Sequence, residues 1–351
     1  MSAKERARDL GIVLDGTPGP RNAITDVPGV EVGYATLVEG AGVRTGVTAV
    51  LPRGKASKDP VFAGWFPLNG NGEMTGTTWI DESGFLEGPV MLTNTHSVGV
   101  VRDAVVGWQA RTGKLFQPFS YPIVAETYDG WLNDINGFHV KPEHAVAAIE
   151  SATAGAIAEG NVGGGTGMVC FAFKGGTGTA SRVVDGHHVG VLVQANFGLR
   201  HQLTIAGVPV GKQIPRDPAT RSVDSPLVRE QGSIIIVVAT DAPLLPHQLK
   251  RVAKRAALGL GRTGSCAGNG SGDIMLAFST ANADAASLTE PARTIQMLSN
   301  GQTSALFEAT ILATEEAILN ALCAAESMTG LEGRTVEALP HDRVRALLRT
   351  R

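Results

Sequence analysis

The stretch DSPLVREQGSIIIVVATDAP, residues 224–243, joins two segments of opposite character. It is charged and broken by proline up to Gly232, whereas five aliphatic residues in a row follow Ser233. A continuous run of β-branched residues that follows glycine is typical of a strand buried on both faces. The sequence therefore predicts a central strand that starts at Gly232–Ser233, immediately after a linker-like segment.

The linker is predicted over residues 212–231. This segment, KQIPRDPATRSVDSPLVREQ, has three prolines and seven charged residues and little apolar periodicity. No other clear linker, internal repeat or low-complexity tract interrupts the 351 residues, so we predict a single domain over 1–351.

Strand-like and helix-like segments alternate along the chain. Several strands are apolar on both faces, so other layers must cover them on each side. Two stacked sheets between helices satisfy this requirement, and we predict such an α/β fold. The predicted strands are 30–37, 46–52, 88–95, 167–176, 187–198, 233–241 and 272–280; the predicted helices are 97–113, 141–160, 243–261 and 303–327.

Composition excludes several classes of protein. The formal net charge is -3 with no basic cluster, which argues against a nucleic-acid partner. The three cysteines have no CxxC spacing, so we expect neither a disulfide framework nor a zinc site, and a reduced compartment fits. The first residues, MSAKERARDLGIVLDG, do not resemble a secretory signal, and no run has the length of a membrane span. We expect a cytoplasmic enzyme or binding protein.

Familiar catalytic and cofactor motifs are absent. There is no HExxH, no Walker lysine loop and no G-x-S-x-G. The glycine-rich GNVGGGTGM at 160–168 lacks the lysine and the dinucleotide spacing, so a crowded turn is the favoured interpretation. His187 and His188 are adjacent and would point to opposite faces of a strand. We predict no metal and no cofactor.

The Gly232–Ser233 junction is the first candidate for chemistry. A hydroxyl on the first residue of a rigid strand is held in place, which suits a nucleophile. Removal of the preceding segment would give Ser233 a free α-amine of pKa near 8, able to accept a proton. Gly232 has no side chain to obstruct attack on its carbonyl by the Ser233 hydroxyl. Pattern alone favours the simpler alternative, a loop that ends in a strand beginning with serine.

The second candidate is GNGSGDI, residues 268–274. Ser271 and Asp273 would face the same side of an extended segment, so that Asp273 orients Ser271 and Ser271 contacts the nucleophile. The alternative is a turn in which these side chains bind local backbone donors. The pattern by itself again favours the turn.

Two further candidates concern the substrate. In AETYDGWLND, Glu126, Tyr128 and Trp131 combine a carboxylate, a phenol and an aromatic wall, a composition that suits a pocket for an ammonium group. The alternative, that these three side chains are simply exposed on a surface loop, is equally open. Asn196, at the end of a predicted strand, has an amide that would donate to an oxyanion, although a turn-forming role is commoner for such a residue.

Taken together, seven stretches resemble the DmpA-like family of L-aminopeptidase/D-esterase-amidases, which includes the β-peptidyl aminopeptidases. The resemblance runs from about Asp15 to the final helix. Each stretch alone is weak evidence, but the set is highly specific: TDVPGVEVG, NGNGEMTGTTWIDESGFLEGP, LTNTHSVG, AETYDGWLNDING, QANFG, GSIIIVVATDAPLLPHQL and GNGSGDI.

The resemblance implies a four-layer αββα sandwich and a precursor that cleaves itself at Gly232–Ser233. The products would be chains 1–232 and 233–351, with Ser233 as nucleophile and new N-terminus. It also implies a tetramer of cleaved heterodimers.

The resemblance also assigns the remaining roles. The Ser-x-acidic relay falls on Ser271 and Asp273, and the oxyanion-stabilising asparagine falls on Asn196. The residues at the substrate amino group fall on Glu126 and Tyr128. β-Peptidyl members have glutamate where Asp273 stands, and some relatives are exported whereas this chain shows no signal.

The expected reaction is acyl transfer to Ser233 and hydrolysis of the acyl-enzyme, on short peptides, amides or esters with a free amino end. Two alternatives remain at this stage. The ornithine acetyltransferases resemble this family in fold and self-cleavage, but they use threonine as nucleophile. A glycine-rich ligand-binding protein that never cleaves is the other. The sequence leaves open the preference among L-α, D-α and β-amino residues.

Overall fold

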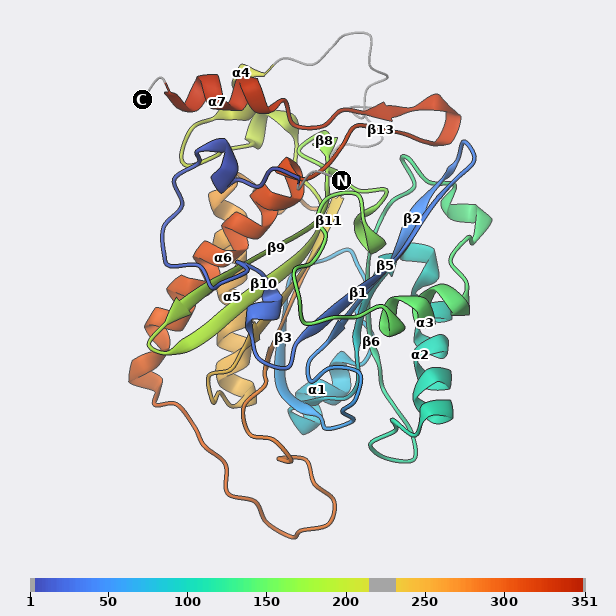
Figure 1. The fold of residues 1–351 in the computed structure, drawn as a ribbon, viewed down its shortest axis with the longest axis vertical. Coiled ribbons are helices and arrows are strands. Elements are labelled where there is room, and N and C mark those ends of the chain that lie inside the picture. The colour runs from blue at the N-terminus through green and yellow to red at the C-terminus, as the bar shows by residue number, and fades with distance from the viewer. Residues whose placement is uncertain (1–3, 215–231, 350–351) are drawn as a thin grey trace.

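The computed structural model describes residues 4–214 and 232–349, and it contains two sheets stacked face to face (Figure 1). The larger sheet has the order β4-β3-β12-β11-β10-β9 and the smaller the order β1-β2-β5-β6. The strands are β1 (Glu31–Glu39), β2 (Val43–Leu51), β3 (Val61–Gly70), β4 (Phe85–Leu86), β5 (Val90–Asn94), β6 (Ile123–Thr127), β9 (Gly176–Val184), β10 (His187–Asn196), β11 (Gly232–Thr240) and β12 (Ser271–Ser279). Two small hairpins are formed by β7 (Val169–Cys170) with β8 (Phe173–Lys174) and by β13 (Met328–Thr329) with β14 (Thr335–Val336).

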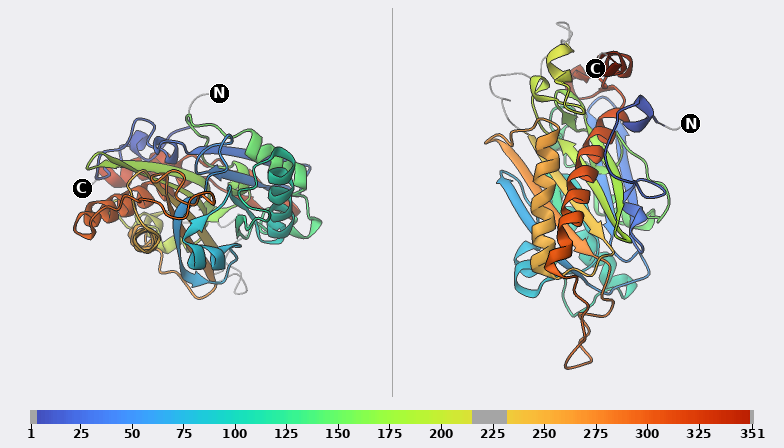
Figure 2. Two further views of the ribbon diagram at one scale, coloured as in Figure 1. Left: turned by 90° about the horizontal axis from the view of Figure 1, so that it is seen from below. Right: turned by 90° about the vertical axis from the view of Figure 1, so that its left-hand side faces the viewer.

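Helices cover the outer face of each sheet (Figures 1 and 2). Helices α5 and α6 pack on the larger sheet, and α2 and α3 pack on the smaller one. The four layers therefore run α, β, β, α, with an apolar cluster at each of the three junctions. This confirms the predicted sandwich. The helices are α1 (Thr77–Ser83), α2 (Val98–Thr112), α3 (Pro142–Glu150), α4 (Val210–Gln213), α5 (Pro246–Arg262), α6 (Thr303–Cys323) and α7 (His341–Arg349).

Strand β11 lies inside the larger sheet, between β10 and β12. Its side chains alternate between two apolar junctions: Ile234 and Ile236 face the helices, whereas Ile235 and Val237 face the smaller sheet. All four are fully buried. The apolar run after Ser233 is thus explained by burial on both faces, as predicted.

Glycine allows the helices to approach the sheets closely. A Cβ atom on Gly178 of β9 would lie 2.0 Å from the Ala317 carbonyl oxygen of α6. On the other outer face, a Cβ atom on Gly33 of β1 would lie 2.1 Å from the Ala148 carbonyl oxygen of α3. Because both contacts are with backbone, neither can be relieved by a side-chain movement. Such close approaches account for some of the 44 glycines of the chain.

Three of the predicted segments differ clearly from the structure. Residues 167–176 do not form one strand, because Phe171 and Ala172 adopt positive φ and turn the chain back between β7 and β8. The helix predicted over 141–160 ends at Glu150, where α3 gives way to an irregular segment. The predicted linker starts late: Lys212 and Gln213 still belong to α4, and 215–231 lie outside the described residues.

Within the described ranges, no helix combines the length and the apolar character that crossing a membrane requires. Cys170, Cys266 and Cys323 are free thiols. Across the same ranges, no group of three or more His, Cys, Asp or Glu side chains is arranged to hold a metal ion.

The close approach at Gly178 yields a test of the packing. We expect Gly178→Ala to lower the free energy of unfolding by about 1–3 kcal/mol, because the added methyl group forces α6 away from β9. Gly261→Ala in α5 is the matched control, since nothing lies within 4 Å of its Cβ position. It should be neutral or stabilising by up to about 1 kcal/mol. Denaturant unfolding followed by circular dichroism measures both; equal stabilities would contradict the packing.

Candidate active site

Strand register brings Ser233 and Asn196, two of the candidate residues, together at one end of the larger sheet. Ser233 lies opposite Asn196 in the antiparallel pair β10–β11 and opposite Gly272 in the parallel pair β11–β12. Ser233 and Asn196 are buried. Residues separated along the chain by more than thirty positions are thus neighbours solely through backbone hydrogen bonding.

Gly232 is required by its surroundings. A Cβ atom at this position would lie 2.8 Å from the Asn196 carbonyl oxygen and 2.9 Å from the Phe197 Cα atom. Any other residue would push β11 away from β10. The absence of a side chain therefore has a packing reason as well as the chemical one argued from the sequence.

Ser233 and the Ser271–Asp273 pair lie on opposite faces of the sheet. By alternation Ser233 shares the face of Ile235, which contacts the smaller sheet. Ser271 and Asp273 share the face of Met275, which contacts the helices. The pair therefore approaches Ser233 from its backbone side, because Ser271 lies opposite Gly232 in the register and Asp273 lies opposite Ile234.

Ser271 and Asp273 form a hydrogen-bonded pair. The Ser271 hydroxyl donates to Asp273 Oδ1 at 2.7 Å, and the Ile234 backbone N–H also favours the ionised carboxylate. Within the described residues Oδ2 has no partner. Burial raises the pKa of Asp273 to about 6, and the two hydrogen bonds lower it only partly. The predicted contact between the two side chains exists, despite the shorter aspartate.

The amide of Asn196 is held in one orientation. Its Oδ1 accepts from the Val169 N–H at 2.8 Å, and its Nδ2 donates to the Tyr128 carbonyl oxygen at 2.9 Å. A side-chain amide nitrogen carries two hydrogens, so one remains beside Ser233. This arrangement supports the oxyanion interpretation of Asn196 over a purely turn-forming one.

Glu126 lies at the end of β6 in the smaller sheet and is buried. The Glu73 N–H donates to Oε1 at 3.0 Å, and the Thr95 hydroxyl donates to Oε2. Across the described ranges no Lys, Arg or His side chain forms an ion pair with it. Burial raises its pKa, and the hydrogen bonds from Thr95 and Glu73 act against this. A buried carboxylate without a cation favours binding of an ammonium group.

The two sheets bring Glu126 towards Ser233. A Cβ atom built on Gly72 would lie 3.3 Å from Glu126 Oε1 and 3.3 Å from the Gly272 Cα atom. Gly272 is the register partner of Ser233. The carboxylate and the nucleophile candidate are therefore separated by little more than the glycine-rich segment at Gly72.

Tyr128 and Trp131 are placed differently from the expectation of a shared pocket. Tyr128 lies beyond the end of β6, and its ring folds over Gly130, where a Cβ atom would lie 2.4 Å from the hydroxyl oxygen. Among the residues described, the Tyr128 hydroxyl forms no hydrogen bond with Glu126. The Arg334 guanidinium lies 4.7 Å from the Trp131 ring centroid and covers one of its faces.

Several polar residues that support the site were not among the candidates from the sequence. Thr95 holds Glu126, while Asn69 and Asn71 donate to backbone carbonyls at 267–270, directly before Ser271. Their signal was present in LTNTHSVG and NGNGEMTG, which served only for the resemblance. Polar residues at the ends of neighbouring strands would have identified them.

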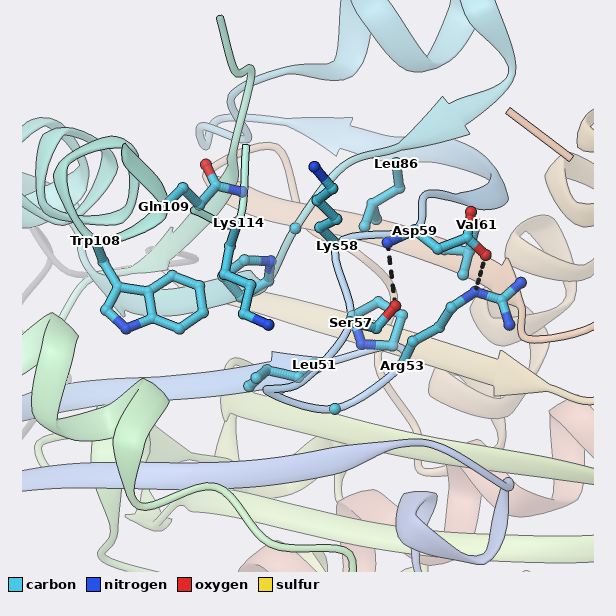
Figure 3. Close-up of a pocket in the computed structure, with 14 residues that line it drawn as sticks. Leu51, Arg53, Ser57, Lys58, Asp59, Val61, Leu86, Trp108, Gln109 and Lys114 are labelled. Atoms are coloured by element: carbon cyan, nitrogen blue, oxygen red, sulfur yellow. Dashed lines mark hydrogen bonds and ion pairs between the residues drawn. The ribbon is translucent and has the colours of Figure 1, made fainter. Parts of the chain in front are cut away.

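A shallow hollow adjoins the site and is lined by Gly232, Ser271, Gln202 and Cys266 among others. A second hollow lies where β2 ends and β5 begins, at the opposite end of the smaller sheet from Glu126 (Figure 3). In it Arg53 pairs with Asp59 at 3.1 Å. The first hollow is therefore the one next to the chemistry.

A four-layer αββα sandwich with a serine at the start of a central strand is the architecture of hydrolases with the N-terminal-nucleophile fold. The chain belongs to peptidase family S58, whose model matches residues 22–336. It is thus a hydrolase of the serine aminopeptidase type. The resemblance stated from the sequence is confirmed.

Three relatives define the similarity. The chain is 57% identical to the β-peptidyl aminopeptidase BapA of Sphingosinicella microcystinivorans, over 98% of this chain and 92% of that protein. It is 45% identical to BapA of Sphingosinicella xenopeptidilytica, over 99% and 92%. The structure of the L-aminopeptidase D-Ala-esterase/amidase of Ochrobactrum anthropi superposes with a TM-score of 0.92 at 47% identity, covering 99% of each chain.

Proposed function

We propose that this protein cleaves itself between Gly232 and Ser233 and then removes amino-terminal residues from short peptides, amides or esters. The observation that carries the proposal is the register that sets Ser233 between Asn196 and Gly272. The relatives named as β-peptidyl aminopeptidases and as an aminopeptidase and amidase support the substrate class. No observation favours the acetyltransferase or the ligand-binding alternative.

In the proposed mechanism the free α-amine of Ser233 accepts the proton of the Ser233 hydroxyl. The hydroxyl oxygen then attacks the substrate carbonyl, and the remaining N–H of Asn196 stabilises the oxyanion. Collapse expels the amine or alcohol, which takes up the proton, and water hydrolyses the acyl-enzyme. Ser271 and Asp273, which approach Ser233 from its backbone side, position this residue and assist its deprotonation.

Glu126 selects substrates with a free amino end. Its carboxylate is buried, already accepts two hydrogen bonds and lies across Gly72 from the nucleophile strand. An ammonium group there would form a charge-assisted hydrogen bond and restore charge neutrality. Tyr128 and Trp131 would complete this pocket after a side-chain movement of Tyr128.

Two finer proposals accompany the function. We place the enzyme in the cytoplasm and expect a tetramer of cleaved heterodimers. Size-exclusion chromatography with light scattering gives the mass of the assembly, and a mass of one heterodimer would refute the tetramer.

The first prediction concerns self-cleavage. Intact mass should show chains 1–232 and 233–351, because Ser233 attacks the Gly232 carbonyl. Ser233→Ala should remain a single uncut chain without hydrolase activity, seen as one band on a denaturing gel. Normal processing of this variant would rule out Ser233 as the nucleophile.

The second prediction concerns the Ser271–Asp273 pair. We expect Ser271→Ala and Asp273→Ala to lower kcat by roughly 10²-fold or more, the usual scale for lost acid–base assistance. In the uncut chain burial raises the Asp273 pKa to about 6, so the carboxylate is ionised above that pH. Self-cleavage of refolded precursor should therefore slow as the pH falls below about 6.

Asp273→Asn is the control for this pH dependence. The asparagine side chain cannot titrate, so self-cleavage of this variant should be slow, and its rate should not fall further as the pH drops below about 6. Asp273→Glu, the residue of β-peptidyl relatives, should be tolerated better than Asp273→Ala. An unchanged kcat in Ser271→Ala would eliminate the relay.

The third prediction concerns the substrate amino group. Glu126→Gln keeps the size and removes the charge, so kcat/KM for aminoacyl amides should fall by about 10- to 150-fold, the equivalent of roughly 1.5–3 kcal/mol. Substrates with an acetylated amino group should be poor for the parent enzyme and little affected by the change. Equal losses on free and acetylated substrates would mean that Glu126 supports the fold instead.

A further inference from the structure

A fully buried lysine lies close to the oxyanion residue of the proposed mechanism. Lys174 has no exposed surface, and its Nζ donates to the Met168 carbonyl oxygen at 2.8 Å and to the Gly175 carbonyl oxygen at 2.9 Å. In the described part of the chain no carboxylate forms an ion pair with it. Burial lowers its pKa to about 7. Such a cation is costly to bury, so a role beyond packing is expected.

The lysine closes the base of a strained hairpin. Strands β7 and β8 are joined by two residues, Phe171 and Ala172, both with positive φ. Such a turn favours asparagine and glycine, and neither stands here. Met168 and Gly175 flank the two strands, and the Gly175 N–H donates to the Met168 carbonyl oxygen at 2.9 Å. Lys174 Nζ donates to the same Met168 oxygen and to the Gly175 carbonyl oxygen, so it joins the two ends of the hairpin.

The hairpin in turn orients the oxyanion amide. Val169, the residue after Met168, donates its N–H to Asn196 Oδ1 at 2.8 Å. This bond holds Oδ1 at the hairpin and so leaves Nδ2, with its second hydrogen, as the donor on the residue opposite Ser233. A second support ties the hairpin to β10, since the Phe171 N–H donates to the Phe197 carbonyl oxygen at 2.6 Å.

We propose that Lys174 is a positioning residue for the oxyanion hole: its ammonium holds Met168 and Gly175, and thereby sets the Val169 N–H that aligns Asn196. The proposal rests on the proposed function, in which Asn196 stabilises the oxyanion. It assigns a catalytic consequence to a buried lysine that contacts neither the nucleophile nor its relay.

The primary test replaces Lys174 by methionine, which keeps the length and removes both hydrogen bonds. In processed enzyme, kcat for aminoacyl p-nitroanilides should fall by roughly 10- to 100-fold while KM changes little, because a misaligned donor weakens the transition state selectively. An aminoacyl aldehyde, which forms a tetrahedral adduct with Ser233, should bind more weakly by the same factor. Binding of a free product amino acid should not change.

Gly178→Ala is the matched control for stability. It strains the same sheet through α6 and touches no residue of the site, so it should lose stability without the selective loss in kcat. Thermal unfolding of both variants shows whether their stabilities are comparable. If Gly178→Ala shows the same kcat loss and the same aldehyde weakening, the effect of Lys174→Met is merely structural and the proposal fails.

Asn196→Ala separates this inference from the proposed function. If Asn196→Ala leaves kcat unchanged, the oxyanion role itself is wrong. If Asn196→Ala is impaired but Lys174→Met is normal, only the positioning role is overturned. If both single variants have a lowered kcat, adding Lys174→Met to Asn196→Ala should lower kcat little further, since the two residues act on one interaction.

A second variant guards against misfolding. Lys174→Ala leaves a cavity of the side chain's shape, and added propylammonium should restore part of kcat to it. The same amine should not activate the parent enzyme or Asn196→Ala. If Lys174→Met does not fold, this rescue decides the question, and its absence in folded, processed Lys174→Ala would refute the proposal.

Discussion

The register at the start of β11 is the constraint on which the site depends. Backbone hydrogen bonds place Ser233 opposite Asn196 on one side and Gly272 on the other. A shift of one residue would move the Ser233 hydroxyl to the other face of the sheet and away from the Asn196 amide. The apolar residues that follow prevent such a shift, because Ile234 and Ile235 must each remain in their own buried layer.

Stacking of the two sheets brings Glu126 of the smaller sheet close to Ser233 of the larger one. Ser233 faces the smaller sheet, and Glu126 stands at the end of a strand of that sheet. Glycine at positions 72 and 272 keeps the intervening segment thin, so a carboxylate and a nucleophile from different layers lie near each other. The core between the sheets thus fixes the spacing that a substrate with a free amino end has to match.

Glu126, Asp273 and Lys174 are buried ionisable groups that lie in or beside this region, and within the described ranges none of them forms an ion pair. Burial raises the pKa of the two carboxylates and lowers that of the lysine. Each is held by hydrogen bonds to hydroxyl or backbone groups. Burial therefore favours the uncharged form of each group until a ligand or a new chain terminus supplies an opposite charge. This behaviour fits a site that changes when the chain is cut and substrate binds.

The sequence by itself determined the layered fold and the start of the central strand at Gly232–Ser233. These follow from local information, namely apolar runs and glycine boundaries. The two-residue spacing of Ser271 and Asp273 allowed their pairing, but the structure decided between this pairing and a turn. The prediction failed at residues 167–176, where the hairpin at Phe171–Ala172 replaces a strand. The bonds of the Lys174 ammonium across the base of the hairpin and the long-range contact with Phe197 hold a turn that local preference disfavours. Only the tertiary structure decided that Ser271 and Asp273 approach Ser233 from the opposite face, that Glu126 lies across Gly72 from it, and that Val169 orients Asn196. These relations join different strands and sheets, and contacts between residues far apart in the chain leave no periodic trace in the sequence.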